Sequence, residues 1–143
     1  MILLDVNVVV AAQRDDHPQH GTVRPWFDAL VDAEETFGAP ATVWASAVRL
    51  TTNRRIFVGP ATPEEAFAFI HAVQAQPSYR PIEPGPRHLD VFRAVCLSSD
   101  ARADLVPDAF LAAVAIENAA TVASFDRDFA RFDGLDWVIP AGP

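Results

Sequence analysis

Short apolar runs and longer helical patterns alternate along the chain. Nearly continuous apolar runs, typical of strands buried on both faces of a parallel sheet, occur at residues 2–6, 121–125 and 137–139. Apolar residues three and four positions apart predict helices at residues 8–14, 19–34, 43–52, 63–76, 86–97 and 107–118. Residues 36–41 are a further strand candidate, and residues 80–83 a weaker one because they contain a proline. This alternation predicts an α/β fold with a short parallel sheet flanked by helices.

Polar residues and prolines suggest where some of these helices begin. Asn7 is a candidate cap for the first helix and Thr42 for the third. Thr62 is followed by a proline and, three residues on, by Glu65, which is the pattern of a capping box. Pro25 lies inside the second helical pattern, so that helix either starts near this proline or is kinked at it.

Composition indicates a folded protein. The chain has 143 residues, half of them apolar and about a fifth charged, so we expect a single domain over residues 1–143. The one cysteine, Cys96, shares a side of its predicted helix with Leu89, Phe92 and Val95, and cannot form a disulfide within the chain. No basic leader precedes the first apolar run, and no run approaches the ~20 residues that span a bilayer. We therefore expect a cytoplasmic protein without a membrane partner.

The charge balance argues against a generic nucleic-acid-binding protein. The net charge is −8, from 11 basic and 19 acidic residues, whereas such proteins depend on neutralising phosphates with Lys and Arg. Enzymes that collect cations on their acidic residues are not excluded, because a bound ion inverts the local field. The sequence contains no lysine, so every basic contact uses the planar fork of an arginine, which suits phosphate or carboxylate.

Three aspartates fall at positions that can converge. Asp5 ends the first apolar run, Asp126 follows the strand at 121–125, and Asp108 lies in the first turn of a helix. Ligand sites of parallel sheets lie just outside the carboxyl ends of the strands, and carboxylates suit hard cations such as Mg²⁺. Taken singly, each aspartate also has an explanation without a metal: Asp5 as a helix cap, Asp126 as a turn residue, and Asp108 as a favourable negative charge at a helix start. Asp128 either reaches the same ion or faces solvent.

Other catalytic motifs are absent from the sequence. The four histidines, at positions 17, 20, 71 and 88, have no zinc-binding spacing. There is no nucleophile elbow of the GxSxG type, no phosphate-binding loop and no GxGxxG fingerprint. Clustered carboxylates are therefore the main candidate for chemistry.

The chain resembles the PIN-domain ribonucleases, specifically the VapC toxins of bacterial type II toxin–antitoxin pairs. The resemblance rests on Leu4-Asp5-Val6-Asn7, on Arg49-Leu50-Thr51-Thr52-Asn53, on the block that starts at Pro107-Asp108-Ala109, and on Ser124-Phe125-Asp126-Arg127-Asp128-Phe129. These motifs cover almost the whole length in the family's order. The resemblance implies a parallel sheet flanked by helices, and an acidic pocket that binds Mg²⁺ or alternatively Mn²⁺.

The resemblance also implies roles for individual residues. Asp5, Asp108 and Asp126 match the acidic positions and would be both catalytic residues and metal ligands, with Asp128 as a further ligand. Asn7 and Ser124 match small polar neighbours that orient the carboxylates. Ser46 stands where many relatives carry a glutamate, so the site has one anionic ligand fewer. This difference would weaken metal binding, leave water in that position, or shift ligation onto Asp128, and it leaves open whether one or two metals bind.

The implied activity is metal-dependent hydrolysis of RNA phosphodiester bonds by a toxin that a cognate antitoxin blocks. Transfer, ribosomal and messenger RNA are all possible substrates, and the sequence does not choose among them. A homodimer is also implied, with the helices around Trp44 and Phe67 as its candidate interface. One alternative is a non-catalytic PIN-like binding module, which Ser46 favours and the three aspartates disfavour. Another is a small-molecule phosphohydrolase, although the chain has no phosphate-binding loop.

Overall fold

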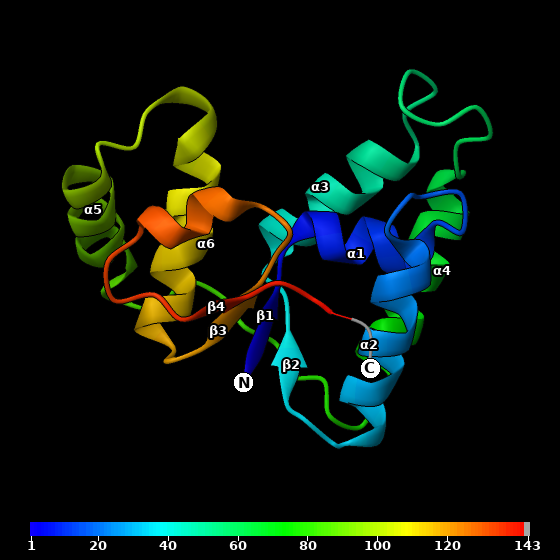
Figure 1. The fold of residues 1–143 in the computed structure, drawn as a ribbon, viewed down its shortest axis with the longest axis horizontal. Coiled ribbons are helices and arrows are strands. Elements are labelled where there is room, and N and C mark those ends of the chain that lie inside the picture. The colour runs from blue at the N-terminus through cyan, green and yellow to red at the C-terminus, as the bar shows by residue number, and fades with distance from the viewer. Residues whose placement is uncertain (142–143) are drawn as a thin grey trace.

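The computed structural model describes residues 1–141 and has four parallel strands at its centre (Figure 1). The strands are β1 (Ile2–Leu4), β2 (Phe37–Gly38), β3 (Thr121–Ala123) and β4 (Trp137–Val138), in the order β2-β1-β3-β4. Leu3 is in register with Gly38 on one side and with Val122 on the other. The carboxyl ends of the two central strands, β1 and β3, therefore lie side by side. This α/β architecture confirms the predicted fold class.

Six helices surround the sheet: α1 (Val6–Gln13), α2 (His20–Asp32), α3 (Ala41–Thr51), α4 (Pro63–Gln74), α5 (His88–Ser99) and α6 (Val106–Glu117). There are also two short 3-10 helices: η1 (Ala103–Leu105) comes directly before α6, and η2 (Arg127–Arg131) follows β3. Figure 1 shows α5 and α6 on one side of the strands and α1 to α4 on the other, with an open space between α6 and α3. No helix in residues 1–141 has both the length and the apolar character needed to cross a membrane.

The buried core contains residues of the central strands and of helices α1 and α6. Helix α6 buries residues on nearly every side, including the run from Leu111 to Ala115, as its alanine-rich sequence predicts. Alanine lets neighbouring backbones approach closely, so α6 packs against both α5 and β3. This packing fixes the first turn of α6, and with it Asp108, at the same end of the sheet as the ends of β1 and β3.

The predicted helix starts are only partly right. The capping box of Thr62 and Glu65 is present at α4. Asn7, however, is not a cap: α1 begins two residues earlier than predicted, at Val6, and its cap is Asp5. Thr42 lies inside α3, where the backbone N–H of Ala41 instead donates to Glu83 at 2.7 Å. In both cases a carboxylate satisfies the free N–H group at the helix start.

Three other details differ from the sequence pattern. Helix α2 begins at His20, upstream of Pro25, so the proline lies within the helix. Residues 80–83 form no strand, and this segment meets the sheet only through a bridge between Tyr79 and Phe37. Leu89, assigned to the packed side of its helix, is 76% exposed, because α5 turns Val95 rather than Leu89 toward the core.

Glu117, at the end of α6, ties the segment before α5 to the core. Its side chain is only 7% exposed and accepts hydrogen bonds from the backbone N–H groups of Gly85 (2.9 Å) and Arg87 (3.1 Å). We expect Glu117→Ala to lower the free energy of unfolding by roughly 2–4 kcal/mol, because two charge-assisted bonds are lost from a buried place. Urea unfolding followed by circular dichroism measures this change. Glu83→Ala removes one exposed bond and should cost about 1 kcal/mol or less; equal losses in the two variants would contradict the prediction.

Candidate active site

Asp5 lies at the junction of β1 and α1. Its Oδ1 accepts a 2.6 Å hydrogen bond from the backbone N–H of Val6, so the carboxylate caps α1. Its own backbone N–H donates to the carbonyl oxygen of Ala123 at 3.0 Å, which joins the ends of the two central strands. The residue is only 6% exposed. The fold therefore holds the Asp5 carboxylate, in a fixed orientation, at the edge of the sheet where the strands end.

Ser124, the residue after β3, connects the polar groups of this edge. Its hydroxyl donates to Asp5 Oδ2 at 2.6 Å and accepts from Asn7 Nδ2 at 2.8 Å and from the backbone N–H of Asp126 at 2.9 Å. These three bonds use the full capacity of a hydroxyl group, which is completely buried here. Asn7 also accepts a bond from the backbone N–H of Phe125 at 3.3 Å. Ser124 thus sets the positions of Asp5, Asn7 and Asp126 relative to one another.

The other aspartates approach from two further elements. Asp108 is half-buried in the first turn of α6. Asp126 caps η2, and its Oδ1 accepts from the backbone N–H of Asp128 at 2.8 Å. Both residues of this pair are exposed, and Asp128 forms an ion pair with Arg131 at 3.5 Å. Sequence reasoning placed all four aspartates at this end of the sheet, and the structure has them there.

The charges of the four aspartates act on one another. Burial raises the pKa of Asp108 to about 6, and the negative charges of Asp5, Asp126 and Asp128 add to the rise. Burial also raises the pKa of Asp5, against the opposing effect of its hydrogen bond from Ser124. Asp5 and Asp108 are therefore costly to ionise in the metal-free site. A cation among them would offset this repulsion.

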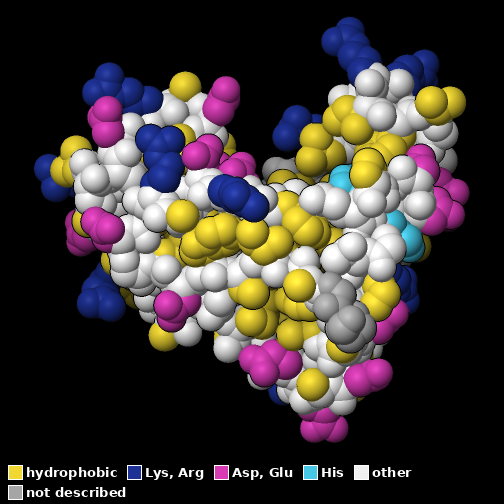
Figure 2. Space-filling view, viewed as in Figure 1, with side chains coloured by type: hydrophobic (Ala, Val, Ile, Leu, Met, Phe, Trp, Pro, Cys, Tyr) yellow, Lys and Arg dark blue, Asp and Glu magenta, His cyan; other side chains and the backbone are white. Residues whose placement is uncertain are grey.

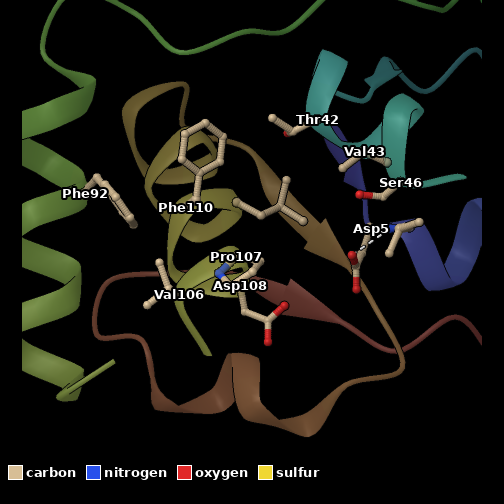
Figure 3. A pocket seen from close by; sticks show the side chains of 11 residues that line it. Asp5, Thr42, Val43, Ser46, Phe92, Val106, Pro107, Asp108 and Phe110 are labelled. Atoms are coloured by element: carbon tan, nitrogen blue, oxygen red, sulfur yellow. Dashed lines mark hydrogen bonds between the residues drawn. The ribbon is translucent and has the colours of Figure 1, made fainter. Parts of the chain in front are cut away.

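A pocket of about 390 Å³ opens between α3 and α6, beside these carboxylates. Figure 3 shows Asp5 and Ser46 at one side of it and Asp108 at the facing side. Aromatic and aliphatic side chains of α5 and α6, among them Phe92 and Phe110, form the far wall. No basic side chain lines the pocket. Its apolar wall had no signal in the sequence, because Phe92 and Phe110 have the spacing of ordinary core residues.

The donor groups suit a hard divalent cation, since they are carboxylate and hydroxyl oxygens. Asp5, Asp108 and Asp126 are the residues that would hold it, with Ser46 beside them in place of a further carboxylate. Within residues 1–141, no three acidic, histidine or cysteine side chains are gathered closely enough to bind one ion directly. Some of the contacts would therefore pass through water, as is usual for Mg²⁺.

Replacing Ser124 with alanine removes a single oxygen atom but should disturb the whole site, because that oxygen makes three hydrogen bonds. The change leaves Asp5 Oδ2 without its donor and Asn7 Nδ2 without its acceptor. We therefore expect any metal-dependent activity to fall about 10- to 100-fold and the free energy of unfolding to fall by roughly 1–3 kcal/mol. Initial rates and urea unfolding measure the two effects. Ser99→Ala is the matched control, because Ser99 bonds only to a backbone carbonyl of its own helix. A Ser124→Ala protein with wild-type activity would show that the hydroxyl does not organise the site.

Comparison with known proteins places this arrangement in a family. The PIN domain family model matches residues 2–135. The ribonuclease VapC25 of Mycobacterium tuberculosis is 55% identical over 140 residues, which cover 98% of this chain and 99% of the relative. Two solved structures share the fold at 16% identity. VapBC2 of Rickettsia felis bound to a promoter DNA fragment has a TM-score of 0.71 and covers 96% of this chain and 98% of its own. VapC20 of M. tuberculosis, a toxin that cleaves the sarcin–ricin loop, has a TM-score of 0.66 and covers 94% of this chain and 98% of its own. The chain therefore belongs to the PIN-domain family and, within it, to the VapC ribonuclease toxins of VapBC toxin–antitoxin systems.

Proposed function

We propose that this chain is a Mg²⁺-dependent endoribonuclease whose catalytic residues are Asp5, Asp108 and Asp126. The observation that carries the proposal is the raised pKa of Asp108, which reflects burial and three neighbouring negative charges at the rim of a pocket. Isolated surface acids do not have this property. PIN-domain ribonucleases are typically metal-dependent, and Mg²⁺, or alternatively Mn²⁺, is the ion that these oxygen donors suit.

Each part of the site has a defined task in this mechanism. The bound ion supplies a more acidic water and a positive charge next to the phosphoryl oxygens. Asp5 and Asp108, which line the pocket, would hold the ion together with Asp126, and Asp128 would be a further ligand. Ser124 and Asn7 keep Asp5 and Asp126 in position through the hydrogen bonds described above. Cleavage by this route leaves a 5′-phosphate and a 3′-hydroxyl.

A cleavage assay on total RNA tests the proposal. The purified protein should cut RNA with Mg²⁺ present, stop when EDTA is added, and recover with excess Mg²⁺. Mapping of new 5′ ends then identifies the substrate among transfer, ribosomal and messenger RNA. RNA binding without any cleavage would instead favour the non-catalytic module, for which Ser46 is the supporting feature. Nucleoside monophosphates serve as the control for a small-molecule phosphohydrolase and should stay intact.

Glutamate at position 46 should strengthen metal binding. Ser46 lines the pocket beside Asp5 and faces Asp108, so Ser46→Glu adds a fourth carboxylate within reach of the ion. We expect the Mg²⁺ concentration for half-maximal cleavage to fall roughly tenfold, because metal affinity rises with the number of anionic ligands. A Mg²⁺ titration of the cleavage rate measures it. Ser46→Gln, of similar size and uncharged, should give no such fall; an equal fall would assign the effect to packing.

The proposed partners are RNA, a cognate antitoxin that blocks the carboxylates, and a second copy of the chain. Phe67 is half-exposed on α4 and lines a surface hollow with Trp44, which supports the α3–α4 face as the dimer interface, although Trp44 itself is largely buried. Residues 1–143 are proposed to form a single domain, since the family match spans residues 2–135. Because the proposed substrates are cellular RNAs, we place the protein in the cytoplasm.

A further inference from the structure

A second cavity adjoins the carboxylates on the other side of α1. It has a volume of about 620 Å³ and is lined by Val6, Asn7, Val10, Asp16, His17, Pro18, Leu50, Ile56, Phe57 and Val58. Val6 lines both this cavity and the acidic pocket, and Asn7 bonds directly to Ser124 in the acidic site. The cavity and the acidic pocket therefore meet at Val6.

The loop between α3 and α4 forms one wall of the cavity and is held in place. Phe57 is buried under the guanidinium of Arg14, whose carbon centre lies 4.4 Å from the ring centroid. Arg14 also donates to the carbonyl oxygen of Gly59 at 2.8 Å and to Asp16. Beside this anchor, Ile56 is 51% exposed and Val58 fully exposed. Ile56 and Val58 thus line the cavity and are exposed to solvent, rather than packed against the rest of the chain.

The same loop carries a concentrated positive charge on an acidic protein. Arg54 and Arg55 are adjacent and exposed, and neither forms an ion pair with a carboxylate in the part of the chain that the structure describes. Figure 2 shows basic side chains at the tip of the arm that Figure 1 assigns to this loop, above the hollow between the two halves of the molecule. By contrast, Arg14, Arg24, Arg102 and Arg131 are each paired with an aspartate.

We infer that this cavity is a subsite for one unstacked base of single-stranded RNA, next to the cleaved phosphate, and that Arg54 and Arg55 bind the backbone phosphates beyond that nucleotide, on the side away from the cut. The inference rests on the proposed nuclease function and goes beyond it by naming the residues that position the substrate. Unpaired bases bind on apolar surfaces while arginines follow the backbone, and this loop supplies both kinds of contact. Each phosphodiester carries one negative charge, so two consecutive phosphates match the two guanidinium groups of Arg54 and Arg55.

His17 gives the subsite a polar contact for a base edge. Its Nδ1 accepts a 3.2 Å hydrogen bond from the backbone N–H of Gln19, so the neutral ring carries its proton on Nε2. Burial lowers the pKa of His17, which keeps the ring neutral near pH 7. The Nε2–H is then a donor at the cavity wall, and it suits an acceptor atom on the base. Asn7 and Asp16 contribute less to recognition, because their side chains already bond within the protein.

Cleavage of a single-stranded RNA by the full-length wild-type protein and its variants tests the inference. Ile56→Ser and Val58→Ser should each raise KM about tenfold with little change in kcat, because each change removes an aliphatic side chain that the base would bury. Arg54→Ala/Arg55→Ala should also raise KM and should reduce the salt dependence of log KM by about 1.4, since each phosphate contact on a single strand contributes about 0.7. His17→Ala should change which base is preferred beside the cut. Leu97→Ser and Arg24→Ala, at exposed positions on α5 and α2, are the controls and should behave as wild type.

The possible outcomes distinguish a failure of the proposed base subsite from a failure of the proposed nuclease function. If the wild type cuts no RNA, the proposed function fails. If the wild type cuts RNA and the serine variants keep its KM, site preference and salt dependence, the subsite is wrong while the nuclease stands. Variants that cut RNA normally but escape inhibition by the antitoxin would assign the cavity to an antitoxin segment, and a change of mass in solution would assign it to a second copy. Both of these results would overturn the inference.

Discussion

Asp108→Asn should abolish Mg²⁺-dependent RNA cleavage, by at least about a thousandfold, while making the metal-free protein more stable at neutral pH. The loss of activity follows because an amide has no negative charge with which to hold the ion, and metal catalysis supplies several kcal/mol of transition-state stabilisation. The gain in stability follows because the ionised Asp108 is repelled by Asp5, Asp126 and Asp128, and asparagine removes that repulsion. Initial cleavage rates at saturating Mg²⁺ and thermal unfolding in EDTA measure the two effects.

Asp104→Asn is the matched control for this variant. Asp104 is an exposed acid in η1, four residues before Asp108. The same change of charge there should leave both the rate and the unfolding temperature close to wild type. If Asp108→Asn kept its activity, the assignment of Asp108 as a metal-holding catalytic residue would be wrong. If it lost activity and stability together, the residue would be structural.

The location of the acidic site could be predicted because the sequence marks where the strands end. The apolar runs before Asp5 and Asp126 end at the aspartates, and the proline before Asp108 marks a helix start. In a parallel sheet these positions must share one edge. The pairing of β1 with β3 then places the first two aspartates side by side. The fold class and the location of the site therefore follow from local patterns together with one general rule of sheet topology.

The connections within the site could not be predicted, because they depend on tertiary contacts. Ser124 looks like any small polar residue after a strand, yet its hydroxyl joins three groups. Asn7 and Asp5 are two residues apart and both are good helix caps. In the structure Asp5 caps α1, while the side chain of Asn7 bonds to Ser124, and the sequence does not show which of the two takes the cap. The apolar α3–α4 loop reads as a simple connection, and its role as a cavity wall depends on the contact between Arg14 and Phe57.

Lowering the pH through 6 should raise the Mg²⁺ requirement of the enzyme steeply. Asp108 has a pKa of about 6, so below that pH a bound ion must displace its proton. Metal ligands must be deprotonated, and the displacement of one proton corresponds to about a tenfold weaker affinity for each pH unit. We therefore expect the Mg²⁺ concentration for half-maximal cleavage to be nearly constant above pH 7 and about tenfold higher at pH 5 than at pH 7. Mg²⁺ titrations of the cleavage rate at each pH measure this dependence.

The metal-free protein should show the opposite preference for pH. Because folding raises the pKa of Asp108 from 3.8 to about 6, the folded state holds this proton more tightly than the unfolded chain does. The stabilisation from that proton is complete below pH 3.8 and is lost as the pH rises through 6. The contribution of Asp108 to the unfolding temperature in EDTA should therefore fall over this range, and saturating Mg²⁺ should reverse the fall. In Asp108→Asn both this fall and the step in Mg²⁺ requirement should shrink, because the titrating group is gone. If the mutant keeps the full wild-type pH dependence, the titration belongs to Asp5, whose pKa is also raised, and not to Asp108.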